Sequence, residues 1–167
     1  VSESDLDPKD TYAGLADPKW KGRICMRDTS EAYTVSLVAS LIDLHGREKA
    51  LEIVEGWVAN DVDVMANDVL LIDAVDAGTC DVALVNHYYL ALVKEEQPDA
   101  PIANHFLAKG DAGALVSVAG VGALATAANA DGAQEFVEYL LSDEGQQFYT
   151  ESAEEAEYPL VAGVPAQ

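Results

Sequence analysis

Hydrophobic and polar positions along the chain follow a repeating order of a short apolar run and then a longer amphipathic stretch. The runs at residues 23–27, 62–65 and 81–86 have the length and composition of strands, and the last of them is apolar almost throughout. In the stretches that follow, apolar residues recur at helical spacing. This alternation predicts an α/β fold with a mainly parallel sheet and helices on both of its faces.

Capping residues and glycines predict where the helices begin and end. Thr29 or Ser30 offers a hydroxyl cap to a first helix that Gly46 ends, and Asn67 or Asp68 caps a third. We expect helices over residues 31–45, 47–60, 68–77, 87–96, 133–141 and 144–152, and further strands over 102–107 and 114–121. The residues expected to face the core are Trp20 in the lead-in and, in the second helix, Ala50, Leu51, Val54, Trp57 and Val58.

Length and charge restrict the classes of protein to consider. The 167 residues suffice for one ordinary domain, and apolar stretches such as 37–42 are far shorter than the roughly 20 residues that span a bilayer, so we expect no membrane insertion. The chain starts at Val1 with no secretory signal, which indicates a processed or truncated start. A net charge of −21 excludes nucleic acid as a partner. The acidity indicates a salt-loving source or simply an acidic soluble protein.

Two cysteines, Cys25 and Cys80, lie in or beside strand-like runs. An even count favours a disulfide if the protein is exported, and two buried thiols if it stays in the cytosol. The residues alone leave both alternatives open.

Candidate ligand groups lie at three predicted strand-to-helix junctions, residues 28–33, 66–68 and 86–89. In parallel sheets, ligands bind at the carboxyl ends of strands, where helix N-termini converge. The groups at these junctions are Ser30, Tyr33, Asn67, Asn86, Tyr88 and Tyr89. Phenolate is a hard anionic donor that suits a small, highly charged cation. On pattern alone, however, half-buried packing is the commoner role for such tyrosines.

Catalytic motifs do not emerge from the sequence. We find no G-x-S-x-G elbow, H-E-x-x-H pair or P-loop, and the three histidines are scattered. Residues 120–125 (GVGALA) match a loose dinucleotide fingerprint, but they lack the long helix and the βαβ unit that the motif requires. We therefore expect a protein that is not an enzyme.

Three long runs carry a resemblance to a known family: RICMRDTSEAYTVSLVASLI, EGWVANDVDVMANDVLLIDAVDAGTCDVALVNHYYLA and GALVSVAGVGALATAANADGAQEFVEYLLSDEGQQF. They resemble the periplasmic ferric-iron-binding proteins of iron ABC importers, which have the type II periplasmic-binding-protein fold. The most specific element is Asn86-His87-Tyr88-Tyr89. The resemblance covers nearly the whole chain, and implies one lobe of that fold and an extracytoplasmic solute-binding protein.

The resemblance also implies a set of site residues. Tyr88 and Tyr89 match the tyrosine pair that binds Fe(III) in the family, and Tyr33 matches a third ligand tyrosine of one subgroup. Other members bind a synergistic anion, carbonate or phosphate, beside the iron. The positions that match their anion site are Ser30, Ala32, Asn67 and Asn86. The family further implies a disulfide between Cys25 and Cys80.

The chain departs from the family in places. Asp28 and Glu31 stand where small or neutral residues are usual, and Leu90-Ala91-Leu92 replaces an aromatic residue or Gly-Arg. The family has two lobes, so residues 1–167 are expected to form the C-terminal lobe, with 113–167 returning toward an N-terminal lobe that carries further ligands. The implied partners are that lobe and the ABC permease. The alternatives are an anion or polyamine carrier on the same scaffold, and a partner-binding module without catalysis.

Overall fold

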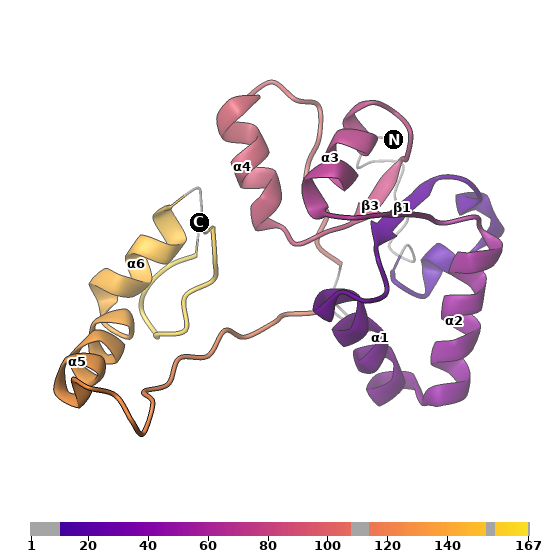
Figure 1. The fold of residues 1–167 in the computed structure, drawn as a ribbon. Coiled ribbons are helices and arrows are strands. Elements are labelled where there is room, and N and C mark those ends of the chain that lie inside the picture. The colour runs from indigo at the N-terminus through magenta and orange to yellow at the C-terminus, as the bar shows by residue number, and fades with distance from the viewer. Residues whose placement is uncertain (1–10, 108–113, 153–155, 167) are drawn as a thin grey trace. The chain divides into compact units, whose positions relative to one another are not determined.

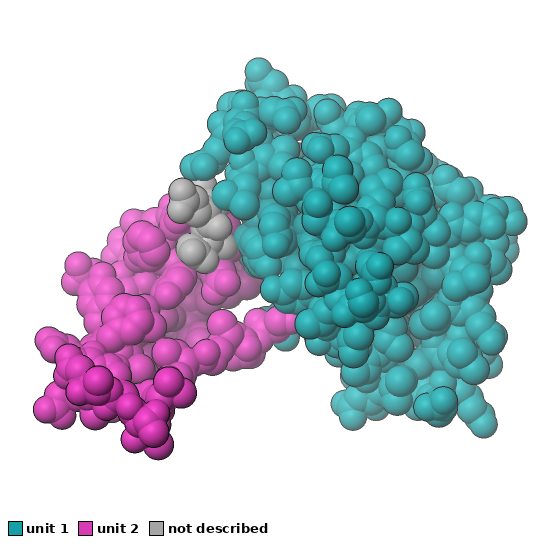
Figure 2. Space-filling model, in the orientation of Figure 1, with its two compact units in different colours: residues 1–116 teal, residues 117–167 magenta. Residues whose placement is uncertain are grey.

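The computed structural model describes residues 11–107, 114–152 and 156–166, and the chain forms two compact units, 1–116 and 117–167 (Figure 2). The first unit contains the sheet (Figure 1). Its elements are the 3-10 helices η2 (Gly14–Ala16) and η3 (Pro18–Trp20), then β1 (Ile24–Arg27), α1 (Ala32–His45), α2 (Arg47–Ala59), β2 (Asp63–Met65), α3 (Asp68–Asp76), β3 (Val82–Leu84) and α4 (Tyr88–Glu96).

The sheet has the order β2-β1-β3, and both neighbours of β1 run parallel to it. In the register, Cys25 lies opposite Asp63 on one side and Ala83 on the other. Each strand is followed by at least one helix, as a parallel connection requires. The α/β class and the three predicted strands of this unit are confirmed.

Side chains of β1 alternate between two apolar layers, one on each face of the sheet. Ile24 and Met26 pack with residues of η2, η3, α1 and α2, among them Trp20, which is 2% exposed and confirms the predicted anchor. Cys25 packs on the opposite face against Leu71 of α3. Successive side chains of a strand point to opposite faces of the sheet. Because both faces of this central strand are covered, consecutive residues of β1 have to be apolar.

The core face of α2 differs in part from the prediction. It consists of Ala50, Ile53, Val54 and Trp57. The predicted Leu51 and Val58 are 54% and 65% exposed, so their assignment to the core was wrong. Successive helical residues diverge by roughly 100°, and the stripe at 50, 53 and 57 leaves its neighbours 51 and 58 to one side.

Gly56 is required where α2 approaches η2. A Cβ at this position would clash with the Ala16 side chain and come within 3.1 Å of Ala16 Cα. Two hydrogen bonds from Asn60 Nδ2, to the carbonyls of Leu15 (2.9 Å) and Asp17 (2.8 Å), hold that segment against α2. The segment therefore cannot easily move away.

We predict that Gly56→Ala destabilises the chain by about 1–2 kcal/mol. Overpacking typically costs ~1–3 kcal/mol, and the higher helix propensity of alanine returns somewhat less than ~1. Urea unfolding would measure the difference. Glu55→Ala is the control, since Glu55 is exposed on the same helix, and it should change stability by less than about 0.5 kcal/mol. A stabilised Gly56→Ala variant would contradict the close approach.

The second unit contains α5 (Ala130–Leu140) and α6 (Asp143–Glu151), which confirm the last two predicted helices. Several of its large apolar side chains are well exposed. They are Val118, Val121, Leu124, Phe136, Tyr139, Leu141, Phe148, Tyr158 and Leu160.

The strands predicted over 102–107 and 114–121 do not form in the described residues, which are irregular there. A strand exists only when its backbone groups pair with a neighbour, and an apolar run cannot supply that neighbour. Among the described helices, none has the length and apolar character that crossing a bilayer requires.

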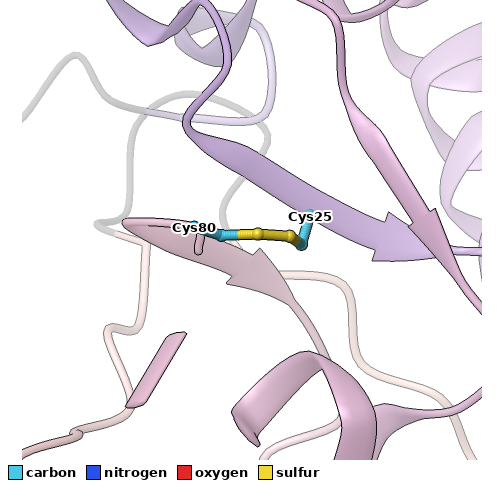
Figure 3. The surroundings of a disulfide bond; sticks show 2 residues. All are labelled: Cys25 and Cys80. Atoms are coloured by element: carbon cyan, nitrogen blue, oxygen red, sulfur yellow. A yellow bond between two sulfur atoms is a disulfide. The ribbon is translucent and has the colours of Figure 1, made fainter. Parts of the chain in front are cut away.

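A disulfide joins Cys25 and Cys80, whose Cα atoms are 5.9 Å apart (Figure 3). Cys25 is fully buried in β1, and Cys80, 4% exposed, precedes β3. The bond therefore connects two segments that also meet in the sheet and are separated by 55 residues of chain.

Candidate metal centre

Two strand-to-helix junctions bring tyrosines to one edge of the sheet. Tyr33 lies in the first turn of α1, which follows β1, and α4 begins with Tyr88 and Tyr89, which follow β3. Because β1 and β3 are parallel neighbours, their carboxyl ends meet at the same edge. Segments more than fifty residues apart in sequence are thus brought side by side.

The three tyrosine side chains are in contact or close to it. The hydroxyl oxygens of Tyr33 and Tyr88 are 3.3 Å apart, within hydrogen-bond distance. The rings of Tyr88 and Tyr89 have centroids 4.7 Å apart and are tilted by 36°. Tyr33 is 41% exposed, and the other two are half-buried. The structure therefore brings together the residues predicted as metal ligands.

The environment of Tyr88 keeps its hydroxyl protonated. Burial raises the pKa of Tyr88 well above the usual value for a phenol, and the neighbouring hydroxyls of Tyr33 and Tyr89 raise it further. A neutral Tyr88 phenol is the expected resting form. A cation that binds here must displace protons, and only a strong Lewis acid does so near neutral pH.

The first junction differs from the predicted cap. Asp28 Oδ1 accepts a hydrogen bond of 2.6 Å from the Ser30 N–H, and this bond is the main reason why the pKa of Asp28 lies below its usual value. The helix then begins at Ala32 with Glu31 as its N-cap residue, which makes no side-chain capping bond. Because Asp28 already forms a turn, neither Thr29 nor Ser30 takes the cap position.

The residues predicted to bind an anion make contacts within the protein. The Ser30 N–H donates to Asp28, and Ala32 is exposed at the start of α1. Asn67 caps α3, its Oδ1 accepting from the Leu70 N–H at 2.9 Å, which confirms this predicted cap. Asn86 Nδ2 lies 3.4 Å from Asp68. The four residues lie at the three junctions, but several of their polar groups already contact other groups of the protein.

Sequence reasoning missed an ion pair at the same edge of the sheet. Arg27, the last residue of β1, pairs with Asp68, the first residue of α3, and their side chains are only 11% and 1% exposed. The hydrogen bond to Asp68 is the largest effect that raises the pKa of Arg27. Two signals in the sequence could have indicated this pair. They are a basic residue at the end of an apolar strand and an acidic residue at the start of a helix.

His87 adjoins the tyrosines at the start of α4. Its ring meets the Tyr88 ring edge-on at 5.7 Å, and its carbonyl accepts a hydrogen bond of 3.1 Å from Asn104 Nδ2. Within the described ranges, no three His, Cys, Asp or Glu side chains gather in a way that could bind a metal ion. The tyrosines are the candidate donors that the described geometry brings together.

Comparison with known proteins identifies the class of protein. The model of the bacterial extracellular solute-binding proteins matches residues 3–166, and the chain belongs to this family. It is 40% identical over 162 residues to iron uptake protein A1 of Synechocystis sp., covering 93% of this chain and 44% of that protein. It is 36% identical over 162 residues to the major ferric iron-binding protein of Neisseria meningitidis serogroup B, covering 96% and 47%.

Solved structures of related proteins share the fold. Iron-bound HitA from Pseudomonas aeruginosa matches all of this chain and 53% of its own, with a TM-score of 0.86 and 33% identity. The Trichodesmium protein IdiA (FutA), in complex with iron and citrate ligands, matches 99% of this chain and 54% of its own, with a TM-score of 0.86 and 39% identity.

These matches define the fold and the extent of the chain. The fold is that of one lobe of a type II periplasmic-binding protein, as the resemblance implied. The chain spans about half the length of the curated relatives it matches. The relatives are solute-binding proteins for iron rather than enzymes, and they do not favour the anion or polyamine carrier or the partner-binding module.

Proposed function

We propose that this chain is the iron-binding C-terminal lobe of an extracytoplasmic solute-binding protein that delivers Fe(III) to an ABC importer. The observation that carries the proposal is the meeting of three tyrosines from two separate junctions, with the Tyr33 and Tyr88 oxygens 3.3 Å apart. Relatives across this length are named for iron uptake or ferric iron binding.

Tyr33, Tyr88 and Tyr89 are the proposed ligands. Ferric iron is small and triply charged, and phenolate oxygens are hard anionic donors that match it. Two adjacent tyrosines can reach one ion because they lie at the very start of α4, where the chain is only entering the helix. The N-terminal amides of α1 and α4 favour the ionised phenolates that binding produces.

A synergistic anion is a second part of the proposal. Ser30, Ala32, Asn67 and Asn86 are the proposed anion-binding residues, with carbonate or phosphate as the anion. The Ser30 amide and the Asn86 side chain already contact the carboxylates of Asp28 and Asp68. Those negative charges disfavour a second anion, so the contacts support binding mainly through the tyrosines.

A second lobe is proposed to complete the site. Three phenolates leave part of the coordination sphere of an iron ion open, and binding sites of this kind lie between domains. Residues 117–167 carry exposed apolar side chains, of which Phe136, Leu141 and Phe148 are at least half exposed. We propose that the segment from about 113 onward returns toward the N-terminal lobe, which would cover this apolar surface.

Iron titration at several pH values tests the proposed function. We expect ferric citrate to produce a visible tyrosinate-to-iron band in a two-lobed protein that carries this chain, and little of it with the chain alone. Binding should release up to one proton per ligand tyrosine. Because the pKa of Tyr88 is raised, its proton stays bound through the neutral range, so iron affinity should rise steadily with pH there.

The control for the iron titration is ferric citrate without protein, which corrects for protons released by the chelate itself. Adding carbonate or phosphate in parallel shows whether an anion strengthens binding. Iron bound without a tyrosinate band, or with an affinity that does not change with pH, would contradict ligation by the three phenols.

A further inference from the structure

We propose that the buried Arg27–Asp68 ion pair is a brace that positions the tyrosine-bearing turns for iron, so that both residues are positioning residues for the site. This inference rests on the proposed function. The pair was not among the residues expected to matter, and it lies at the same edge of the sheet as the tyrosines.

Asp68 connects the second junction to the third. Its Oδ1 accepts a hydrogen bond of 2.9 Å from the Asn86 N–H and lies 3.4 Å from Asn86 Nδ2, while its Oδ2 pairs with Arg27. The Asn86 carbonyl in turn accepts a hydrogen bond of 3.3 Å from the Tyr89 N–H. One carboxylate therefore holds the turn from which Tyr88 and Tyr89 project.

Arg27 connects that carboxylate to the first junction. Its Nη2 is 2.9 Å from the Glu31 carboxylate, and Glu31 is the N-cap residue of α1. The Arg27 carbonyl also lies 3.5 Å from the hydroxyl of Thr34, the residue after Tyr33. Together, Glu31, Arg27, Asp68 and Asn86 form a continuous chain of contacts from the turn of Tyr33 to the turn of Tyr88.

Burial makes the pair unusual for a merely structural contact. Transfer of two charges out of water is costly, and an apolar pair of the same size is often as stable or more so. A more exposed ion pair joins Arg23 and Asp81, which lie just before β1 and β3, and its side chains are 39% and 33% exposed. Of these two pairs, the buried one lies within the chain of contacts between the two tyrosine-bearing turns.

The test compares variants in a two-lobed protein that carries this chain. In Asp68→Asn, the side-chain oxygen can still accept from Asn86, but the charge that holds Arg27 is lost; Arg27→Lys keeps a charge but cannot bridge Asp68 and Glu31 as a planar fork does. We expect each to weaken iron affinity by about 10–100-fold, the range typical of groups that orient metal ligands. The tyrosinate band at saturation should also shift or weaken.

Matched controls separate positioning from stability. Asp81→Asn removes the charge of the less buried pair and should leave affinity and band unchanged. Ile53→Val weakens a core cluster that contains none of the three tyrosines, and the same result is expected. If Asp68→Asn does not fold, Arg27→Lys still tests the positioning role. Unchanged affinity and band in a folded brace variant would overturn the inference. If Tyr88→Phe also left iron binding unchanged, the proposed function itself would fall, and the two failures are thus distinguishable.

Discussion

Tyr88→Phe, in a two-lobed protein that carries this chain, is expected to lose more than about 100-fold in Fe(III) affinity. Removal of a group that merely orients a metal ligand costs ~10–100-fold, and loss of the ligand itself should exceed that range. Tyr88 lies between the other two phenols, with its oxygen 3.3 Å from that of Tyr33 and its ring against Tyr89. Its substitution should therefore cause the largest single loss.

Phenylalanine keeps the ring and removes only the donor oxygen, so the fold should survive. The rings of Tyr88 and Tyr89 pack against each other, and this contact does not need the hydroxyl. Competition with citrate would measure the affinity, and the tyrosinate band should weaken in Tyr88→Phe, Tyr89→Phe and Tyr33→Phe and vanish in the triple variant. Tyr139→Phe, on an exposed side chain of α5, is the control and should behave as wild type.

The outcome of the tyrosine series also discriminates between kinds of site. If an anion and groups of the other lobe held the iron without these phenols, all three variants would keep their affinity, and our assignment would be wrong. If only Tyr33→Phe left the iron affinity unchanged, the site would use Tyr88 and Tyr89 alone. Graded losses across all three variants are what the contacts in the structure predict.

Local patterns predicted most of the fold of the first unit. β1, β2 and β3 follow from short apolar runs, and Gly46, with φ of +81°, ends α1 where the sequence indicated. A residue other than glycine rarely adopts that conformation, so the signal is local and readable. The junctions of the candidate site followed from the alternation of strands and helices, because ligands bind at the carboxyl ends of parallel strands.

What the sequence could not predict depends on distant partners. Arg27 and Asp68 are 41 residues apart, and nothing near either one shows that they meet. Residues 102–107 have the composition of a strand, but a strand needs a paired neighbour, and the described residues supply none there. The direction in which Asn86 points was likewise set by the buried carboxylate of Asp68, not by its own surroundings in sequence.

Reduction of the Cys25–Cys80 disulfide is expected to lower the free energy of unfolding by about 4 kcal/mol. The bond closes a loop of 55 residues, and the chain-entropy estimate for a loop of that length is ~4 kcal/mol at 25 °C. A typical domain has only ~5–15 kcal/mol of stability, so the loss is large. Urea unfolding with and without reductant measures it on one sequence, with no cavity introduced.

The control for reduction is Cys25→Ala/Cys80→Ala, whose stability should not respond to reductant. Alkylation of the unfolded wild-type chain should label two thiols only after reduction, because the oxidised chain has none to label. The slope of the urea transition should also increase on reduction, since the freed unfolded chain exposes more surface. An unchanged midpoint and slope would mean that the bond contributes nothing to stability.

Iron affinity should respond differently from stability, and it is measured after the reductant has been removed, because free reductant would convert Fe(III) to Fe(II). Cys25 lies within β1 opposite Ala83, and Cys80 lies just before the start of β3, whereas the tyrosines lie beyond the carboxyl ends of β1 and β3. At temperatures where the reduced protein stays folded, its iron affinity should therefore match that of the oxidised protein within about twofold, or ~0.4 kcal/mol. A large loss of affinity on reduction would instead show that loss of the disulfide changes the arrangement of the tyrosines.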